Sequence, residues 1–104
     1  MAAIAVNKAK TATLSSTTVD TLTFSQLWDM IEVVNLTGTS GVAFTVDGTT
    51  PAVDGDDCYQ VDPGSSLKID ASANVTGTSM VVKVIGNGNK YRVTGVVRYQ
   101  YGSA

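Results

Sequence analysis

Residues 28–64, WDMIEVVNLTGTSGVAFTVDGTTPAVDGDDCYQVDPG, decide the fold of this chain. Apolar residues occupy alternate positions in this stretch, first at Ile31 and Val33 and then at Val42 and Phe44. A period of two is typical of a strand that buries one face. The stretch therefore predicts a strand, a tight turn, a second strand and a long acidic loop.

The length and composition of the chain predict one small all-β domain. A chain of 104 residues is long enough to bury a hydrophobic core. Charged residues make up 15% of it, compared with roughly 25% in average globular proteins, and Val and Thr are abundant. Because β-branched side chains fit a half-buried pleated surface, this composition favours strands over helices.

Charge and residue usage also exclude several kinds of partner and cofactor. The formal net charge of -2 argues against binding to the phosphate backbone of nucleic acids. The chain has one cysteine, Cys58, so no disulfide can form within it, and it has no histidine. The usual zinc site therefore lacks its two commonest ligands, and we expect no metal and no cofactor.

The first ten residues predict an extended arm, which leaves residues 11–104 as the folded domain. They are rich in alanine, carry Lys8 and Lys10, and have no clear hydrophobic period. Such an arm need not be ordered in the isolated protein, and we expect it to add a strand to the sheet edge of a neighbouring copy. The chain shows no secretory signal and no run of roughly 18 apolar residues, so we expect synthesis in the cytoplasm and no membrane contact.

Eight strands are expected along the domain, at residues 11–14, 19–24, 28–36, 42–47, 59–61, 67–69, 78–86 and 89–101. Turn signals separate them at regular intervals, which is typical of a β-sandwich or barrel. The turn TGTSG at 37–41 predicts an antiparallel hairpin between its two flanking strands. The expected fold is a small antiparallel β-sandwich of seven or eight strands with an extended N-terminal arm.

A second hairpin is predicted around Asn87-Gly88, because this dipeptide suits a type I′ turn with two positive φ angles. Pairing outward from the turn sets Val84 opposite Tyr91 on the core face. The same register sets Lys83 opposite Arg92 on the other face.

Like charges on directly opposed residues destabilise a sheet by roughly 0.2–1 kcal/mol, so an acidic group is expected near Lys83 and Arg92. Three candidates remain open: the loop at residues 54–57, Glu32 on an adjacent strand, and an acidic patch on another subunit.

No enzyme site can be assembled from the reactive residues. Without histidine the chain cannot form a Ser-His-Asp or Cys-His arrangement, and Cys58 lies among acidic residues, with no neighbouring base to activate it. Asp54, Asp56 and Asp57 lie too close together on a glycine-containing loop for a typical acid/base pair. They also lack the spacing of an EF-hand calcium loop, so we interpret them as a solvated turn.

Aromatic residues offer an alternative function of a different class, carbohydrate binding. Trp28, Tyr91, Tyr99 and Tyr101 could form a platform on which sugar rings stack. By alternation, however, Tyr91 and Tyr99 share the inward face with the valines of their strand, which favours a place in the core.

Three runs of the sequence resemble small virion proteins of tailed bacteriophages: DMIEVVN, VAFTVDGTTPAVDGDDCYQVDPGSS and VVKVIGNGNKYRVTGV. The resemblance covers residues 28–97. The matching positions are Glu32, Val33, Asn35, Asp47, Gly48, Thr49, Pro51, Gly55, Asp56, Asp57, Tyr59, Pro63 and Gly64. Cys58 departs from the small polar residue expected at its position, which puts a family role for that residue in doubt.

The resemblance implies a head decoration or minor capsid protein, that is, a small β-sandwich on the capsid exterior. We therefore expect a virion structural protein that binds the major capsid protein, cements neighbouring capsomers and forms a homotrimer. The alternatives are a neck or tail component and a carbohydrate-binding module that recognises surface glycans. The residues expected to contact the capsid or another subunit are Lys8, Lys10, Asp54, Asp56, Asp57, Lys83 and Arg92.

Overall fold

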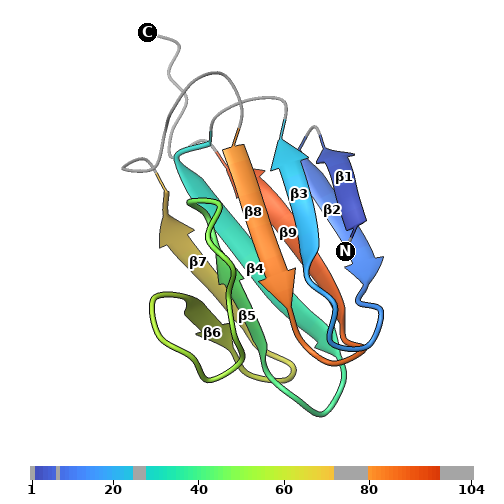
Figure 1. Ribbon diagram of the computed structural model, residues 1–104. Coiled ribbons are helices and arrows are strands. Elements are labelled where there is room, and N and C mark those ends of the chain that lie inside the picture. The colour runs from blue at the N-terminus through green and yellow to red at the C-terminus, as the bar shows by residue number, and fades with distance from the viewer. Residues whose placement is uncertain (1, 7, 25–27, 72–79, 97–104) are drawn as a thin grey trace, which may run out of the picture.

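The computed structural model of the chain (Figure 1) describes residues 2–6, 8–24, 28–71 and 80–96. These residues form nine strands and no helix: β1 (Ala2–Val6), β2 (Ala9–Thr13), β3 (Asp20–Phe24), β4 (Met30–Thr37), β5 (Val42–Thr45), β6 (Tyr59–Val61), β7 (Ser66–Asp70), β8 (Met80–Ile85) and β9 (Lys90–Val96). Residues 78–79 and 97–101 of two predicted strands lie outside the described residues. The all-β fold class is confirmed.

The strands form two sheets that pack face to face. One sheet has five strands in the order β1-β3-β8-β5-β6, and the other has four in the order β2-β9-β4-β7. In Figure 1 the five-stranded sheet lies in front of the four-stranded one. Every described pair of neighbours is antiparallel except β1 and β3, which are parallel. The predicted antiparallel β-sandwich is therefore confirmed.

Both predicted hairpins are wrong. β4 lies in the four-stranded sheet and β5 in the five-stranded sheet, and the same division separates β9 from β8. The turns at 38–41 and 86–89 are therefore arches that carry the chain from one sheet to the other. Only Gly88 of the Asn87-Gly88 dipeptide has a positive φ, at 70°, so the turn is not the predicted type I′.

The hairpins were mispredicted because a hairpin and an arch require the same alternation of apolar residues. In either case the apolar face of each strand points into the core. The predicted inward positions Val84 and Tyr91 are indeed both buried. What the alternation cannot specify is whether the two strands bond to each other or face each other across the core.

The expected juxtaposition of Lys83 and Arg92 disappears with the hairpin. Lys83 pairs with Thr21 and Thr45 in the five-stranded sheet. Arg92 lies in the other sheet, where its guanidinium Nε donates a hydrogen bond to Thr11 Oγ1 at 3.0 Å. The two cations belong to different sheets, so no shared acidic partner is needed.

The N-terminal segment is extended over β1 and the start of β2, as predicted. These strands pair within the chain: β1 pairs along its whole length with β3, and β2 pairs with β9. Each strand covers backbone groups at a sheet edge that would otherwise be open. The segment lacks a single hydrophobic period because its two strands belong to different sheets.

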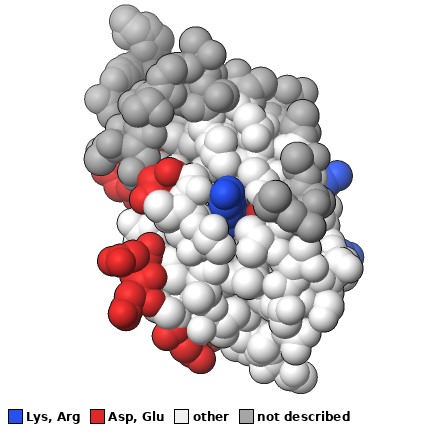
Figure 2. Space-filling model, viewed as in Figure 1, with Lys and Arg blue, Asp and Glu red and all other residues white. Residues whose placement is uncertain are grey.

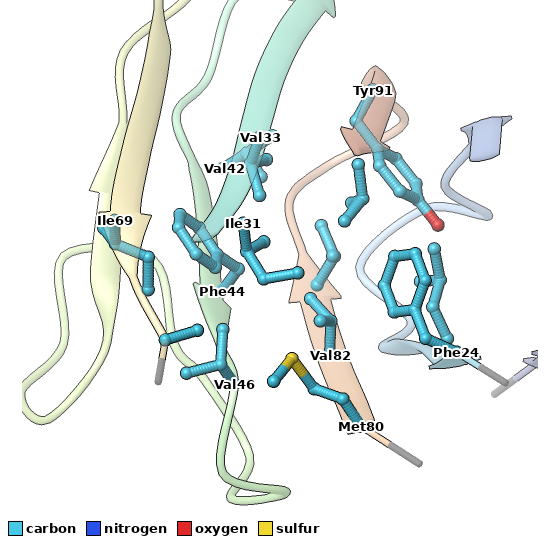
Figure 3. Packing of buried hydrophobic residues seen from close by; sticks show 14 of the residues in the cluster. Phe24, Ile31, Val33, Val42, Phe44, Val46, Ile69, Met80, Val82 and Tyr91 are labelled. Atoms are coloured by element: carbon cyan, nitrogen blue, oxygen red, sulfur yellow. The ribbon is translucent and has the colours of Figure 1, made fainter. Parts of the chain in front are cut away.

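The core lies between the sheets and receives side chains from both (Figure 3). Its largest fully buried side chains include Tyr91, Phe24, Phe44, Leu22 and Ile31.

Two contacts tie the sheets together. The Tyr91 hydroxyl donates a hydrogen bond to Asp20 Oδ2 at 2.7 Å, and burial together with this bond raises the pKa of Tyr91. Trp28 is buried against Gly95, where a Cβ would collide with the indole ring, and it meets the edge of Phe24 at 6.2 Å between ring centroids.

A buried polar network fixes the two arches to each other. Asn89 Nδ2 donates to Asn35 Oδ1 at 3.0 Å and to the Ser40 carbonyl at 2.9 Å. Asn35 Nδ2 in turn donates to the Val61 carbonyl at 3.2 Å. Gly38 adopts a φ of 123°, and a Cβ there would collide with the Asn89 side-chain amide. The network thus determines where each chain crossing occurs.

Candidate functional site

A groove of about 810 Å³ opens where β5 and β6 separate. Residues 42–44 of β5 pair with residues 59–61 of β6, and the long loop between these strands forms the rest of the groove wall. The groove is lined by Thr45, Val46, Asp47, Thr49, Thr50, Asp56, Asp57, Cys58 and Tyr59. Most of these residues come from the acidic loop that the sequence marked as unusual.

Gln60 holds the loop in a defined shape. Its side-chain Oε1 accepts a hydrogen bond from the Asp54 amide at 2.9 Å, and its Nε2 donates to the Ala52 carbonyl at 3.1 Å. The Gly55 amide donates to the same carbonyl at 2.9 Å. Asp54 has a φ of 59°, a left-handed conformation that aspartate tolerates better than most residues. The loop is therefore an ordered wall of the groove.

Asp47 is fixed at one end of the groove by Thr49. Its Oδ1 accepts hydrogen bonds from the Thr49 hydroxyl at 2.6 Å and from the Thr49 amide at 3.1 Å. These bonds stabilise the carboxylate and lower the pKa of Asp47 below its ordinary value. Thr45 Oγ1 donates to the Thr49 carbonyl at 2.6 Å, which ties the turn back onto β5.

Tyr59 forms the aromatic wall of the groove. Its ring stacks on buried Phe44 with 5.2 Å between centroids and 29° between planes. It remains 41% exposed, and among the described residues only Val53 is another exposed large hydrophobic side chain. Tyr59 thus stacks on the core and is still partly exposed to solvent.

The structure distributes the predicted acidic contact residues over this loop. Asp56 and Asp57 line the groove and are exposed, whereas Asp54 is exposed on the loop but does not line the groove. Figure 2 shows the acidic side chains gathered at one side of the molecule, where the loop and β6 lie. Asp47 joins them in the groove, although the sequence did not mark it as a contact residue.

The predicted basic contact residues lie elsewhere and do not form one site. Lys8 is exposed, and half-buried Lys10 lies opposite Val93 at the edge of the four-stranded sheet. Lys83 and Arg92 occupy different sheets, as described above. None of the described residues that line the groove is Lys or Arg.

The groove offers neither a metal site nor an activated nucleophile within the described part of the chain. No three His, Cys, Asp or Glu residues there are arranged to hold a metal ion. The Cys58 thiol donates to the Ala52 carbonyl at 3.4 Å, and Gln60 Nε2 donates to its sulfur at 3.3 Å. These contacts give Cys58 a structural place in the loop.

Tyr59 is the residue that the sequence reasoning missed. Trp28 and Tyr91, considered there as a sugar platform, are buried in the core. Tyr99 and Tyr101 lie outside the described residues. A signal for Tyr59 was its place at the start of a strand of only three residues, directly after the acidic loop, since a short edge strand leaves its aromatic side chain partly open.

A second surface of note is the outer face of the five-stranded sheet. Thr21 and Lys83 lie side by side on it, with Val81 and Ile85 of β8 on either side of Lys83. Thr45, the partner of Lys83 on β5, is buried, and its hydroxyl bonds to the Thr49 carbonyl. Lys83 is the only charged residue among these positions, and Figure 2 shows most of this face free of charge. Glu32, Lys68, Lys90 and Arg92 lie at outward positions of the other sheet, so the two outer faces differ in charge density.

No helix capable of spanning a membrane occurs in the described residues. Comparison with protein-family models finds no match, and comparison with curated protein sequences finds no significant similarity.

Proposed function

We propose that this chain is a non-enzymatic structural protein of a tailed-phage virion. In this proposal it is a decoration protein that binds the outer capsid surface as a homotrimer and stabilises the contacts between capsomers. The sequence support is the resemblance of residues 28–97 to small phage virion proteins.

The structural observation that carries the proposal is the low charge of the outer face of the five-stranded sheet. Thr21, Val81 and Ile85, all half-buried, surround Lys83, which is the single charge among these positions of β3 and β8. The centres of protein interfaces are depleted in charged residues, because a buried charge must find a partner to compensate for lost hydration. This face therefore suits a broad contact with the major capsid protein, with Lys83 paired to a capsid carboxylate.

Copy number tests the proposal most directly. Quantitative mass spectrometry of purified particles measures this chain relative to the major capsid protein. A ratio within a few-fold of unity is expected for a decoration protein that covers the shell. A ratio far below that would move the chain to the neck or tail, and its absence from particles would refute a virion role.

Two charge reversals test which face binds. Lys83→Glu places a carboxylate in the middle of the proposed contact, and we expect capsid binding to weaken by about tenfold or more, since burying an unpaired charge costs about 2 kcal/mol or more. Lys90→Glu, at an exposed position of the four-stranded sheet, is the matched control and should leave binding unchanged. Loss of binding in the control alone would assign the contact to the four-stranded sheet.

A further inference from the structure

We propose that the groove between β5 and β6 binds a neutral sugar ring, with Tyr59 as its stacking platform. This inference does not depend on a virion role. It rests on the shape and the chemistry of the groove, which lies beside the low-charge face described above.

The first argument is the support of the aromatic ring. Tyr59 has little freedom to tilt because its ring stacks on that of its cross-strand partner Phe44, which is fully buried, with 5.2 Å between centroids and 29° between planes. Tyr59 nevertheless stays 41% exposed, so part of the residue is accessible to a ligand in the groove. A rigid aromatic face open to solvent suits the C–H face of a pyranose, which packs on it without losing hydroxyl hydration.

The second argument is the polar rim. Asp47 uses Oδ1 for both of its bonds to Thr49, so Oδ2 is left to accept a hydrogen bond from a ligand hydroxyl. Asp56 and Asp57 add exposed carboxylates along the same groove. Binding sites for small polar ligands typically combine an apolar wall with a few such oriented polar groups, and about 810 Å³ accommodates one or two sugar rings.

The third argument determines the ligand class. The groove carries the carboxylates of Asp47, Asp56 and Asp57, and no described lining residue carries a positive charge. These carboxylates would repel an anionic sugar in the groove, such as a uronic acid, a sialic acid or a sugar phosphate. The charge of the groove therefore favours neutral sugars over anionic ones.

The experiment is binding of the full chain to a printed array of neutral and acidic glycans. NMR titration follows with the best neutral glycan and with N-acetyl-arginine amide as a cationic probe. We expect saturable binding to neutral glycans only, with amide shifts confined to residues of the groove such as Thr49 and Tyr59. Binding to no neutral glycan, binding to acidic glycans alone, or groove shifts with the arginine probe alone would overturn the inference.

Variants separate ring stacking from fold stability. Tyr59→Leu keeps an apolar cover on Phe44 but removes the ring face, and should weaken binding by about tenfold, whereas Tyr59→Phe keeps the ring and should retain it. Val53→Ala, at the other exposed apolar residue of the loop, is the control and should bind normally. If Tyr59→Leu does not fold, a double variant at two exposed residues, Asp56→Asn with Asp57→Asn, serves as the test instead. It should discriminate less strongly against acidic glycans. Unchanged discrimination in that double variant, or unchanged affinity in folded Tyr59→Leu, would refute the assignment.

Discussion

The buried contact between Asn35 and Asn89 allows the sharpest test of the fold. Asn89→Ala removes four hydrogen bonds, two donated by Nδ2 and two accepted by Oδ1. The Ser40 hydroxyl and the Asn87 backbone amide, which donate to Oδ1, belong to residues that are at least partly exposed, so both can bond to water instead. The Ser40 carbonyl still accepts a bond from Asn35. The Oδ1 atom of Asn35 cannot accept a replacement hydrogen bond from water, because the Asn35 side chain is fully buried.

The magnitude follows from these two kinds of loss. An unsatisfied buried acceptor costs roughly 1–3 kcal/mol, and the space left by the amide adds about 1 kcal/mol. Gly38 and Gly86 both lie against this amide, so the cavity is bounded by backbone that cannot easily collapse. We expect the free energy of unfolding to fall by about 3 kcal/mol, out of a total of roughly 5–15 kcal/mol for a domain of this size.

Urea unfolding followed by Trp28 fluorescence measures this change. Trp28 is the only tryptophan and is buried, so its emission reports the loss of the core. With a slope of roughly 1–3 kcal/mol per molar urea, the midpoint should fall by about 1–3 M. Asn87→Ala, an exposed neighbour in the same turn, is the control and should change stability by less than about 0.5 kcal/mol. Equal effects of the two substitutions would refute the view that the buried pair fixes the arches.

Three further predictions concern the core and the groove. Gly95→Ala should destabilise the domain by about 1–3 kcal/mol in urea unfolding, because its Cβ would meet the Trp28 indole, whereas Thr94→Ala at the adjacent outward position should have little effect. Tyr91→Phe leaves the buried Asp20 carboxylate without its hydroxyl donor and should cost about 1–3 kcal/mol. Because the pKa of Tyr91 is raised in the folded state, the stability of the unsubstituted protein should fall as pH rises above 10.0, and a pH series that shows the same slope for Tyr91→Phe would contradict this. For Asp47, whose pKa is lowered in the folded state, the associated stability is present above pH 3.8 and is lost as pH falls. Carboxyl NMR should give a titration midpoint below 3.8 for Asp47, and Thr49→Val should move that midpoint towards 3.8. An unchanged midpoint in the variant would count against the Thr49 contact.

The candidate site was only partly predictable from the sequence. The acidic loop at residues 54–57 stood out by composition, and it does form a wall of the groove. Asp47 and Tyr59 could not be assigned to that groove beforehand, because they reach it through the separation of β5 from β6. Lys83 and Arg92 were placed together by a turn signal that describes only local backbone geometry.

Eight of the nine strands, and the inward faces of those that build the core, follow from the sequence alone, whereas β1 was expected only as part of an extended arm. Alternation is a local property, and burying one face of Ile31 and Val33 or of Val82 and Val84 is favourable whichever strands lie alongside. Which strands bond to one another depends instead on contacts across the whole fold. The alternation around the turns at 38–41 and 86–89 allows either a hairpin or an arch, and contacts between residues distant in sequence, above all the buried Asn35–Asn89 pair, select the arch.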